Sequence, residues 1–203
     1  TYRNHGINKI HVVRGYKKES INFPELNYID NDDHETTSEL SSFHKAIDQI
    51  SGDIVCSFGD VLFKPYLLQL LDECEDDLVI VVDTQWKDSV NRDRAADYVN
   101  CSQPHSRANY GDSIFLESAG ENLGEDSIHG EWMGIIKISS AIFPTVRKEV
   151  ESLSKLENFD SMKMHHLLEH LCRLKQPIRV VYTTGNWLDV DTLEDVIRAN
   201  NFL

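Results

Sequence analysis

The stretch Asp53-Ile54-Val55-Cys56-Ser57-Phe58-Gly59-Asp60-Val61-Leu62-Phe63 decides the fold class that we predict. Its apolar, β-prone middle is typical of a strand that is buried on both faces. The strand breaks at Gly59 and delivers the carboxylate of Asp60 at its carboxyl end. Ligands of open α/β sheets bind beyond the carboxyl ends of the strands, so Asp60 is a candidate ligand for a metal ion. A polar cap on a strand-to-helix loop explains Asp60 equally well at this point.

A second apolar run at 78–82 follows a helix that we expect from Pro65 to about Glu73. A strand, a helix and a strand in this order imply a right-handed parallel crossover. Later apolar runs predict strands at 132–138 and 178–182, and amphipathic patterns predict helices at 38–50, 139–156, 160–175 and 192–199. Strands that alternate with helices in this way predict an α/β domain.

The composition excludes several classes of protein. With 203 residues, 40% of them hydrophobic, the chain is long enough for one domain with a sizeable core. The formal charge of −14 argues against nucleic acid as the main partner. No apolar run approaches the roughly 20 residues of a membrane helix, and the four cysteines are widely spaced, so we expect a cytoplasmic protein with reduced thiols.

A second candidate acid lies far downstream, in the stretch Trp187-Leu188-Asp189-Val190-Asp191. Asp189 follows the strand predicted at 178–182, so we expect it to meet Asp60 at the same edge of the sheet. Two carboxylates in one crevice suit Mg²⁺, a hard ion that prefers oxygen ligands. Asp191 is a third candidate ligand, although with Glu194 it also fits a capping box at the start of the last helix.

Four stretches in order along the chain carry a resemblance to a known superfamily: 7–17, Phe58–Phe63, Gly130-Glu131-Trp132-Met133-Gly134 and 185–192. Together they resemble the nucleotidyltransferases, which join a nucleoside triphosphate (NTP) to a phosphorylated or phosphonate substrate. The best match is to cytidylyltransferases that act on phosphonates such as 2-aminoethylphosphonate. These are related to bacterial phosphocholine cytidylyltransferases, and some are fused to a phosphoenolpyruvate phosphomutase. The resemblance covers nearly the whole chain.

The resemblance implies a fold and a reaction. The fold would be a three-layer α/β/α, Rossmann-like domain over residues 1–203, with a mixed, mostly parallel sheet of nucleotide-diphospho-sugar transferase type. The reaction would be transfer of a cytidylyl group from CTP, or of a nucleotidyl group from another NTP, to a small phosphonate or phospho-alcohol, with release of pyrophosphate. Asp60 and Asp189 would be catalytic and would hold Mg²⁺, and no covalent enzyme intermediate would form. The protein would act as a homo-oligomer or beside a fusion partner domain.

The beginning of the chain departs from this superfamily. The family opens with a strand, a Gly-rich loop that grips the NTP phosphates, and a Lys-Pro segment, and none of these precedes Ile7 here. We therefore expect a domain that lacks its first strand and that binds NTP poorly by itself, because backbone N–H groups of such a loop would cradle the triphosphate.

The loop before the first predicted helix supplies candidate nucleotide contacts. By resemblance, Thr36, Thr37 and Ser38 lie near the base, and Gly59 lies near the nucleotide. Ser38 is also explained as the N-cap of the helix at 38–50, so this alternative stays open.

Candidate acceptor contacts come from two later stretches. A carboxylate beside an indole suits an ammonium group, which makes Glu131 and Trp132 candidates, with Trp187 as a second ring. Lys137 is a candidate for contact with an acceptor phosphonate. Core packing is the alternative for both tryptophans.

Two other functions remain open at this stage. A sugar-1-phosphate nucleotidyltransferase is less favoured, because the chain has no β-helical extension and the pair Glu131 and Trp132 suits a cation better than a sugar. A non-catalytic remnant with a structural or regulatory role in a larger enzyme is the alternative from another class.

Overall fold

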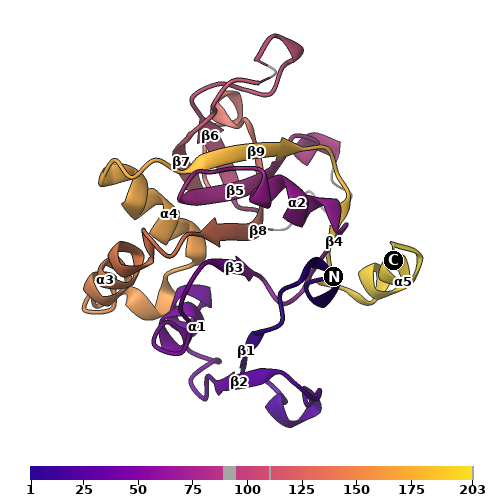
Figure 1. Cartoon of the computed structure of the whole chain (residues 1–203), viewed down its shortest axis with the longest axis vertical. Helices are drawn as coiled ribbons and strands as arrows, with labels where there is room; N and C mark the ends of the chain where they lie inside the picture. Colours follow the sequence, from indigo (N-terminus) through magenta and orange to yellow (C-terminus); the bar gives the residue numbers. More distant parts are fainter. Residues whose placement is uncertain (89–94, 110, 203) are drawn as a thin grey trace.

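A six-stranded mixed sheet forms the centre of the computed structural model, which describes residues 1–88, 95–109 and 111–202 (Figure 1). The strands are β1 (His11–Arg14), β2 (Asn27–Asp30), β3 (Ile54–Ser57), β4 (Val61–Phe63), β5 (Leu78–Asp83), β6 (Tyr98–Cys101), β7 (Leu116–Gly120), β8 (Gly130–Ile138), β9 (Arg179–Thr183) and β10 (Trp187–Asp189). The helices are α1 (Glu39–Ala46), α2 (Tyr66–Asp72), α3 (Phe143–Leu153), α4 (Met164–Arg173) and α5 (Leu193–Phe202). The strand order is β7-β6-β8-β5-β9, and β3 also pairs with β8.

The sheet is mixed, as predicted, but its pairings are mostly antiparallel rather than mostly parallel. The long strand β8 lies at its centre. It runs antiparallel to β3, β5 and β6, whereas β5 and β9 are parallel. β6 pairs with the first residues of β8, and β3 pairs with the last residues of β8. β6 and β3 therefore lie one after the other along the same edge of β8. The predicted crossover from β3 to β5 therefore joins two parallel strands, but β8 lies between them.

Helices cover both faces of this sheet, which explains the uninterrupted apolar sequence of β5. Side chains alternate along a strand, so Ile80 and Val82 pack with α1, α3 and α4, while Val79 and Val81 pack with α2 on the opposite face. All six residues of β5 are buried. Buried apolar surface on both sides confirms the predicted three-layer architecture.

As predicted, the first strand of the decisive stretch ends before Gly59, but 53–63 also contains a second strand that we did not predict. The stretch divides into β3, which pairs with β8, and β4, which pairs with β10 in a separate two-stranded sheet. At the division, Phe58 packs against Gly134, where a Cβ would lie 2.2 Å from the ring; Gly134 also has a φ of +73°. β3 is half-buried rather than buried on both faces, because only one of its edges pairs with another described strand.

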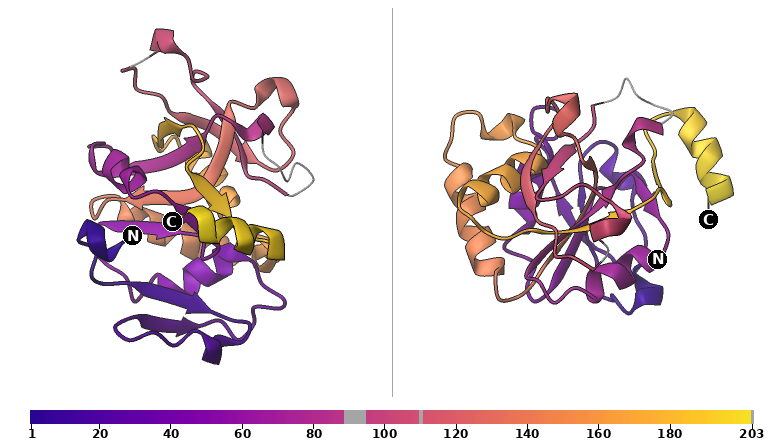
Figure 2. Two further views of the ribbon diagram at one scale, coloured as in Figure 1. Left: turned by 90° about the vertical axis from the view of Figure 1, so that its right-hand side faces the viewer. Right: turned by 90° about the horizontal axis from the view of Figure 1, so that it is seen from above.

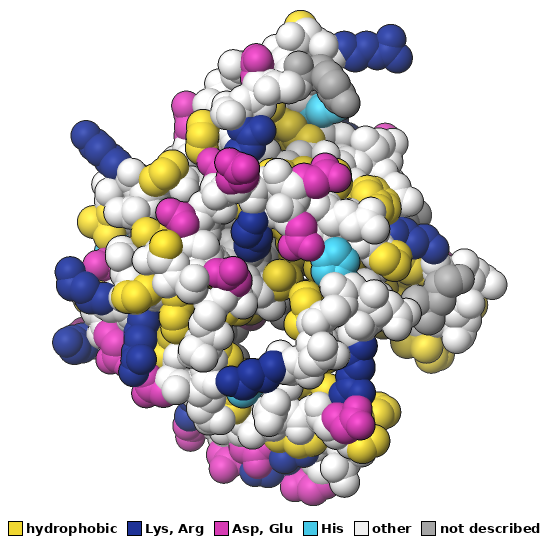
Figure 3. Space-filling model, viewed as in Figure 1, with side chains coloured by type: hydrophobic (Ala, Val, Ile, Leu, Met, Phe, Trp, Pro, Cys, Tyr) yellow, Lys and Arg dark blue, Asp and Glu magenta, His cyan; other side chains and the backbone are white. Residues whose placement is uncertain are grey.

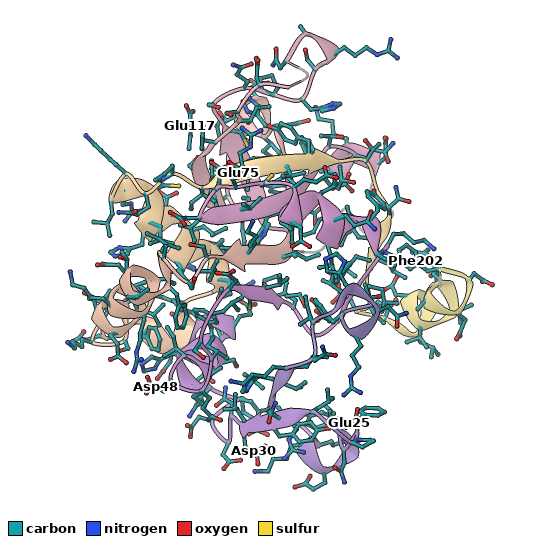
Figure 4. The ribbon with its side chains drawn as sticks, viewed as in Figure 1. Glu25, Asp30, Asp48, Glu75, Glu117 and Phe202 are labelled. Atoms are coloured by element: carbon teal, nitrogen blue, oxygen red, sulfur yellow. The ribbon has the colours of Figure 1, made fainter. Side chains whose placement is uncertain are left out.

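Two peripheral parts flank this core. β1 and β2 form a parallel pair that stands apart from the main sheet, below β3 in Figures 1 and 2. Helix α5 projects sideways and contacts β10, and its last residue that the structure describes, Phe202, stacks with the Lys64 ammonium 4.7 Å from the ring centroid (Figure 4). No helix in the described part of the chain is long and apolar enough to cross a membrane.

Candidate metal and nucleotide site

Three aspartates meet where β4 and β10 pair. The antiparallel register places Asp189 opposite Val61, and the Val190 N–H donates to the Asp60 carbonyl over 3.0 Å. Carboxylate oxygens of Asp60, Asp189 and Asp191 all lie within 4.8 Å of one another. The structure thus brings the two sequence-predicted acids together, although they are far apart in the sequence.

Asp191 is not the helix cap that its sequence suggested. The Thr192 N–H donates to Asp195 Oδ2 over 3.0 Å, and the Asp195 N–H donates to Thr192 Oγ1 over 3.3 Å. The capping box of α5 is therefore formed one residue later, by Thr192 and Asp195, and the Thr192 hydroxyl lowers the pKa of the Asp195 carboxyl. Asp191 is an exposed residue whose carboxylate stands beside the other two acids.

The donor set fits a hard divalent cation. It consists of carboxylate oxygens alone, which favours Mg²⁺ over the softer metals that select sulfur or imidazole. Two ligands on opposite sides of Mg²⁺ lie about 4 Å apart, so small side-chain rotations within the 4.8 Å cluster would suffice. Asp60 and Asp191 are exposed and Asp189 is half-buried, which leaves the cluster accessible to the phosphates of a ligand.

A cavity of about 1000 Å³ opens beside these acids. Figure 3 shows its opening between the part that carries β1 and β2 and the rest of the molecule. The edges of β1 and β3 line it, together with Gly59, and each of these two strands pairs with one other strand among the described residues. An extended ligand or chain segment would therefore find backbone groups on both walls.

The predicted acceptor residues on β8 also line this cavity. Glu131 is 3% and Trp132 2% exposed. The Trp132 indole N–H donates to the Ile135 carbonyl over 2.9 Å, and its ring packs edge-on against Phe58. Trp132 therefore both packs in the core and borders the cavity. Core packing and contact with an acceptor, the two interpretations of this residue from the sequence, are compatible.

Trp187 also lines the cavity, and its indole nitrogen is hydrogen-bonded. Its Nε1 donates to Asp83 Oδ2 over 2.8 Å, and its ring packs against the core residues around α2. This anchored ring precedes Asp189 by two residues on β10.

Four of the predicted binding residues lie away from the cavity. Lys137 Nζ donates to the Leu71 carbonyl over 3.0 Å and also to the Cys74 carbonyl, so it caps the end of α2 and does not line the cavity. The hydroxyls of Thr36 and Thr37 donate to the Asp33 carbonyl. The Ser38 N–H donates to the Asp160 carbonyl over 2.8 Å, and its side chain makes no capping bond.

Three lining residues escaped the sequence analysis: Glu39, Asp97 and Lys163. Burial raises the pKa of the Glu39 carboxyl, and an ion pair with Glu121 raises the pKa of the Lys163 ammonium. Their only sequence signal was a position at the start of a predicted helix for Glu39 and Lys163; Asp97 lies in a segment without periodicity.

Asp97 belongs to a second group of close ligand atoms, with Glu121 and His165. His165 Nδ1 lies 2.6 Å from Asp97 Oδ1, and Glu121 pairs with Lys163. These pairings account for the close approach of the three side chains.

Solved structures with the same architecture are nucleotidyltransferases. The inositol-1-phosphate CTP transferase from T. maritima superposes with a TM-score of 0.74 at 15% identity, covering 98% of this chain and 77% of that one. The CTP:phosphocholine cytidylyltransferase from Streptococcus pneumoniae superposes with a TM-score of 0.65 at 10% identity, covering 98% and 80%. The chain therefore has the nucleotidyltransferase fold, as its sequence motifs predicted.

A comparison with curated protein sequences finds a similarity to one cytidylyltransferase. The chain is 24% identical over 207 residues to the CTP:phosphoglutamine cytidylyltransferase of Campylobacter jejuni, and the match covers 94% of this chain and 80% of that protein. No protein-family model matches the chain. The resemblance that the sequence motifs predicted agrees with these findings: the chain is similar in sequence to a cytidylyltransferase and has the fold of nucleotidyltransferases.

Proposed function

We propose that this protein transfers a cytidylyl group from CTP to a small phosphonate or phospho-alcohol, with release of pyrophosphate and with Mg²⁺ held by Asp60, Asp189 and Asp191. The observation that carries the proposal is the convergence of these carboxylates, within 4.8 Å, at the wall of a large cavity. CTP as the donor is supported by the relatives, whose names specify CTP.

In the proposed reaction, an oxygen of the acceptor phosphate or phosphonate attacks the α-phosphorus of CTP. A bond from that oxygen to the α-phosphorus forms, the bond from the α-phosphorus to the bridging oxygen breaks, and pyrophosphate leaves. Bound Mg²⁺ would offset the charge of the phosphate oxygens. The chain contributes position: the β4–β10 ladder fixes the three carboxylates, and Gly59 leaves room beside Asp60. The attacking oxygen is already ionised, so no general base is required.

Pyrophosphate release, measured over four NTPs and a series of phosphorylated acceptors, tests this proposal. We expect release with CTP plus a phosphonate or phospho-alcohol. Preference for a sugar 1-phosphate would favour the sugar nucleotidyltransferase alternative, and no release with any pair would favour the non-catalytic alternative.

The acceptor is proposed to carry an ammonium group. Glu131 and Trp132 line the cavity, and Glu39 and Asp97 add two further carboxylates to the same lining. Of these two, Asp97 is paired with His165 over 2.6 Å, and Glu39 accepts the Met164 N–H over 3.2 Å. The nearby Lys163 ammonium is paired with Glu121. This part of the cavity therefore favours the positive end of a ligand, while the phosphate end belongs at the three aspartates.

Replacing Glu131 with glutamine tests the ammonium site. We expect the KM for an ammonium-bearing acceptor to rise about tenfold, because the charged contact is lost while the shape is kept. The KM for CTP and that for an acceptor without a cation should stay within twofold. The exposed Glu117, replaced by glutamine, provides the control (Figure 4). An equal rise in KM for the acceptor with a cation and for the acceptor without one would show that Glu131 only supports the packing of β8.

A further inference from the structure

A buried carboxylate outside the three-aspartate cluster holds the segment that leads into β10. Asp83, the last residue of β5, is 6% exposed. Its Oδ1 accepts the N–H groups of Gln85 over 3.0 Å and of Gly185 over 2.9 Å. Its Oδ2 accepts the indole N–H of Trp187 over 2.8 Å. Both oxygens are thus used, and all three of these partners are donors.

These bonds connect two separate sheets. β5 and β9 belong to the main sheet, whereas β10 pairs with β4. The chain crosses from β9 to β10 through Thr184-Gly185-Asn186, where Gly185 and Asn186 have positive φ of 61° and 66°. Asp83 binds this crossing at Gly185 and again at Trp187, so the main sheet fixes the point at which β10 begins.

The geometry points to Asp83 as a positioning residue for the metal site. By fixing the start of β10, it sets the place of Asp189 and Asp191 relative to Asp60, which β4 carries from the other side. This inference rests on the proposed function, since it concerns the same carboxylates.

A carboxylate is required for this role because three donors converge on it. An amide at position 83 accepts through one atom and donates through the other, so either orientation places its NH₂ against an N–H. The conflict is at Trp187 in one orientation and at Gly185 and Gln85 in the other. Removing the indole N–H would relieve the conflict at Trp187. A second substitution at Trp187 should therefore partly restore what Asp83→Asn loses.

The test measures the affinity for Mn²⁺, a spectroscopic substitute for Mg²⁺, in the full chain without substrates. We expect Asp83→Asn to weaken Mn²⁺ binding by roughly 10- to 100-fold, the usual effect of losing a residue that orients metal ligands. Trp187→Phe alone should weaken it less, and the double variant should bind more tightly than Asp83→Asn. Asp77→Asn, at the opposite end of β5, is the matched control.

The outcomes separate this inference from the function on which it rests. Wild-type protein that binds no Mn²⁺ would refute the metal site itself. Binding by the wild type that is unchanged within twofold in Asp83→Asn and in Trp187→Phe would refute the role of Asp83. If Asp83→Asn does not fold, Trp187→Phe decides, because it keeps an aromatic ring and removes the indole N–H that donates to Asp83. The double variant could also lose as much Mn²⁺ affinity as Asp83→Asn, or more. That result would count against a positioning role for Asp83.

Discussion

Replacing Asp60 with alanine lowers kcat at least about 1000-fold and leaves the fold intact; this is the largest effect that we expect. Charge stabilisation by a bound metal contributes several kcal/mol to a transition state, and about 4 kcal/mol corresponds to 1000-fold. Asp60 is exposed, so its removal opens no cavity in the core. Asp189→Ala should show a loss of the same order, because its carboxylate belongs to the same cluster. Steady-state pyrophosphate release and thermal unfolding are the two measurements.

The exposed Asp126 provides the control for this substitution, since it lies in the turn before β8 and away from the cavity lining. Asp126→Ala should retain the wild-type rate. An Asp60→Ala protein that keeps more than a tenth of the wild-type kcat would contradict the metal assignment, whatever its stability.

Removing divalent cations should abolish pyrophosphate release, and Mg²⁺ should restore it. The physical reason is the charge at the site: three carboxylates lie within 4.8 Å, in a chain of net charge −14, and would repel the triphosphate unless a cation intervenes. We expect activity to fall to about 0.1% or less (about 1000-fold, from the same transition-state charge) after treatment with a chelator.

The concentration of Mg²⁺ needed for half-maximal activity makes this prediction specific to the site. Asp191→Asn should raise that concentration by about tenfold, the low end of the effect of a weakened metal site. Substituting the real capping residue, Thr192→Ala, should leave it near the wild-type value and affect α5 instead. Full activity in the presence of chelator would rule out the proposed chemistry.

The sequence predicted the pair Asp60 and Asp189 because each follows an apolar strand, and strand ends in an α/β domain gather at one edge. It did not predict β10 or the division of 53–63 into β3 and β4. Strands of three residues carry too little periodicity, and the choice of pairing partner depends on distant parts of the chain.

The remaining differences have local causes. Asp191 and Thr192 are both good capping residues, and the sequence cannot tell which of two neighbours begins the helix. Lys137 was expected at the site because it lies in or just after a strand near it, but its side chain bonds to carbonyl groups at the end of α2 instead. No sequence pattern predicted the roles of Asp83 and Asp97, because these roles depend on hydrogen-bond donors from distant parts of the chain.

Mn²⁺ binding to the wild-type chain and to Asp60→Asn plus Asp189→Asn, followed by electron paramagnetic resonance, tests the central claim most directly. The three-carboxylate site predicts one bound Mn²⁺ per wild-type chain and an affinity at least about 100-fold weaker in the double variant, the upper end for a damaged metal site. Equal binding by the two proteins would show that these acids, although they converge, do not hold the metal.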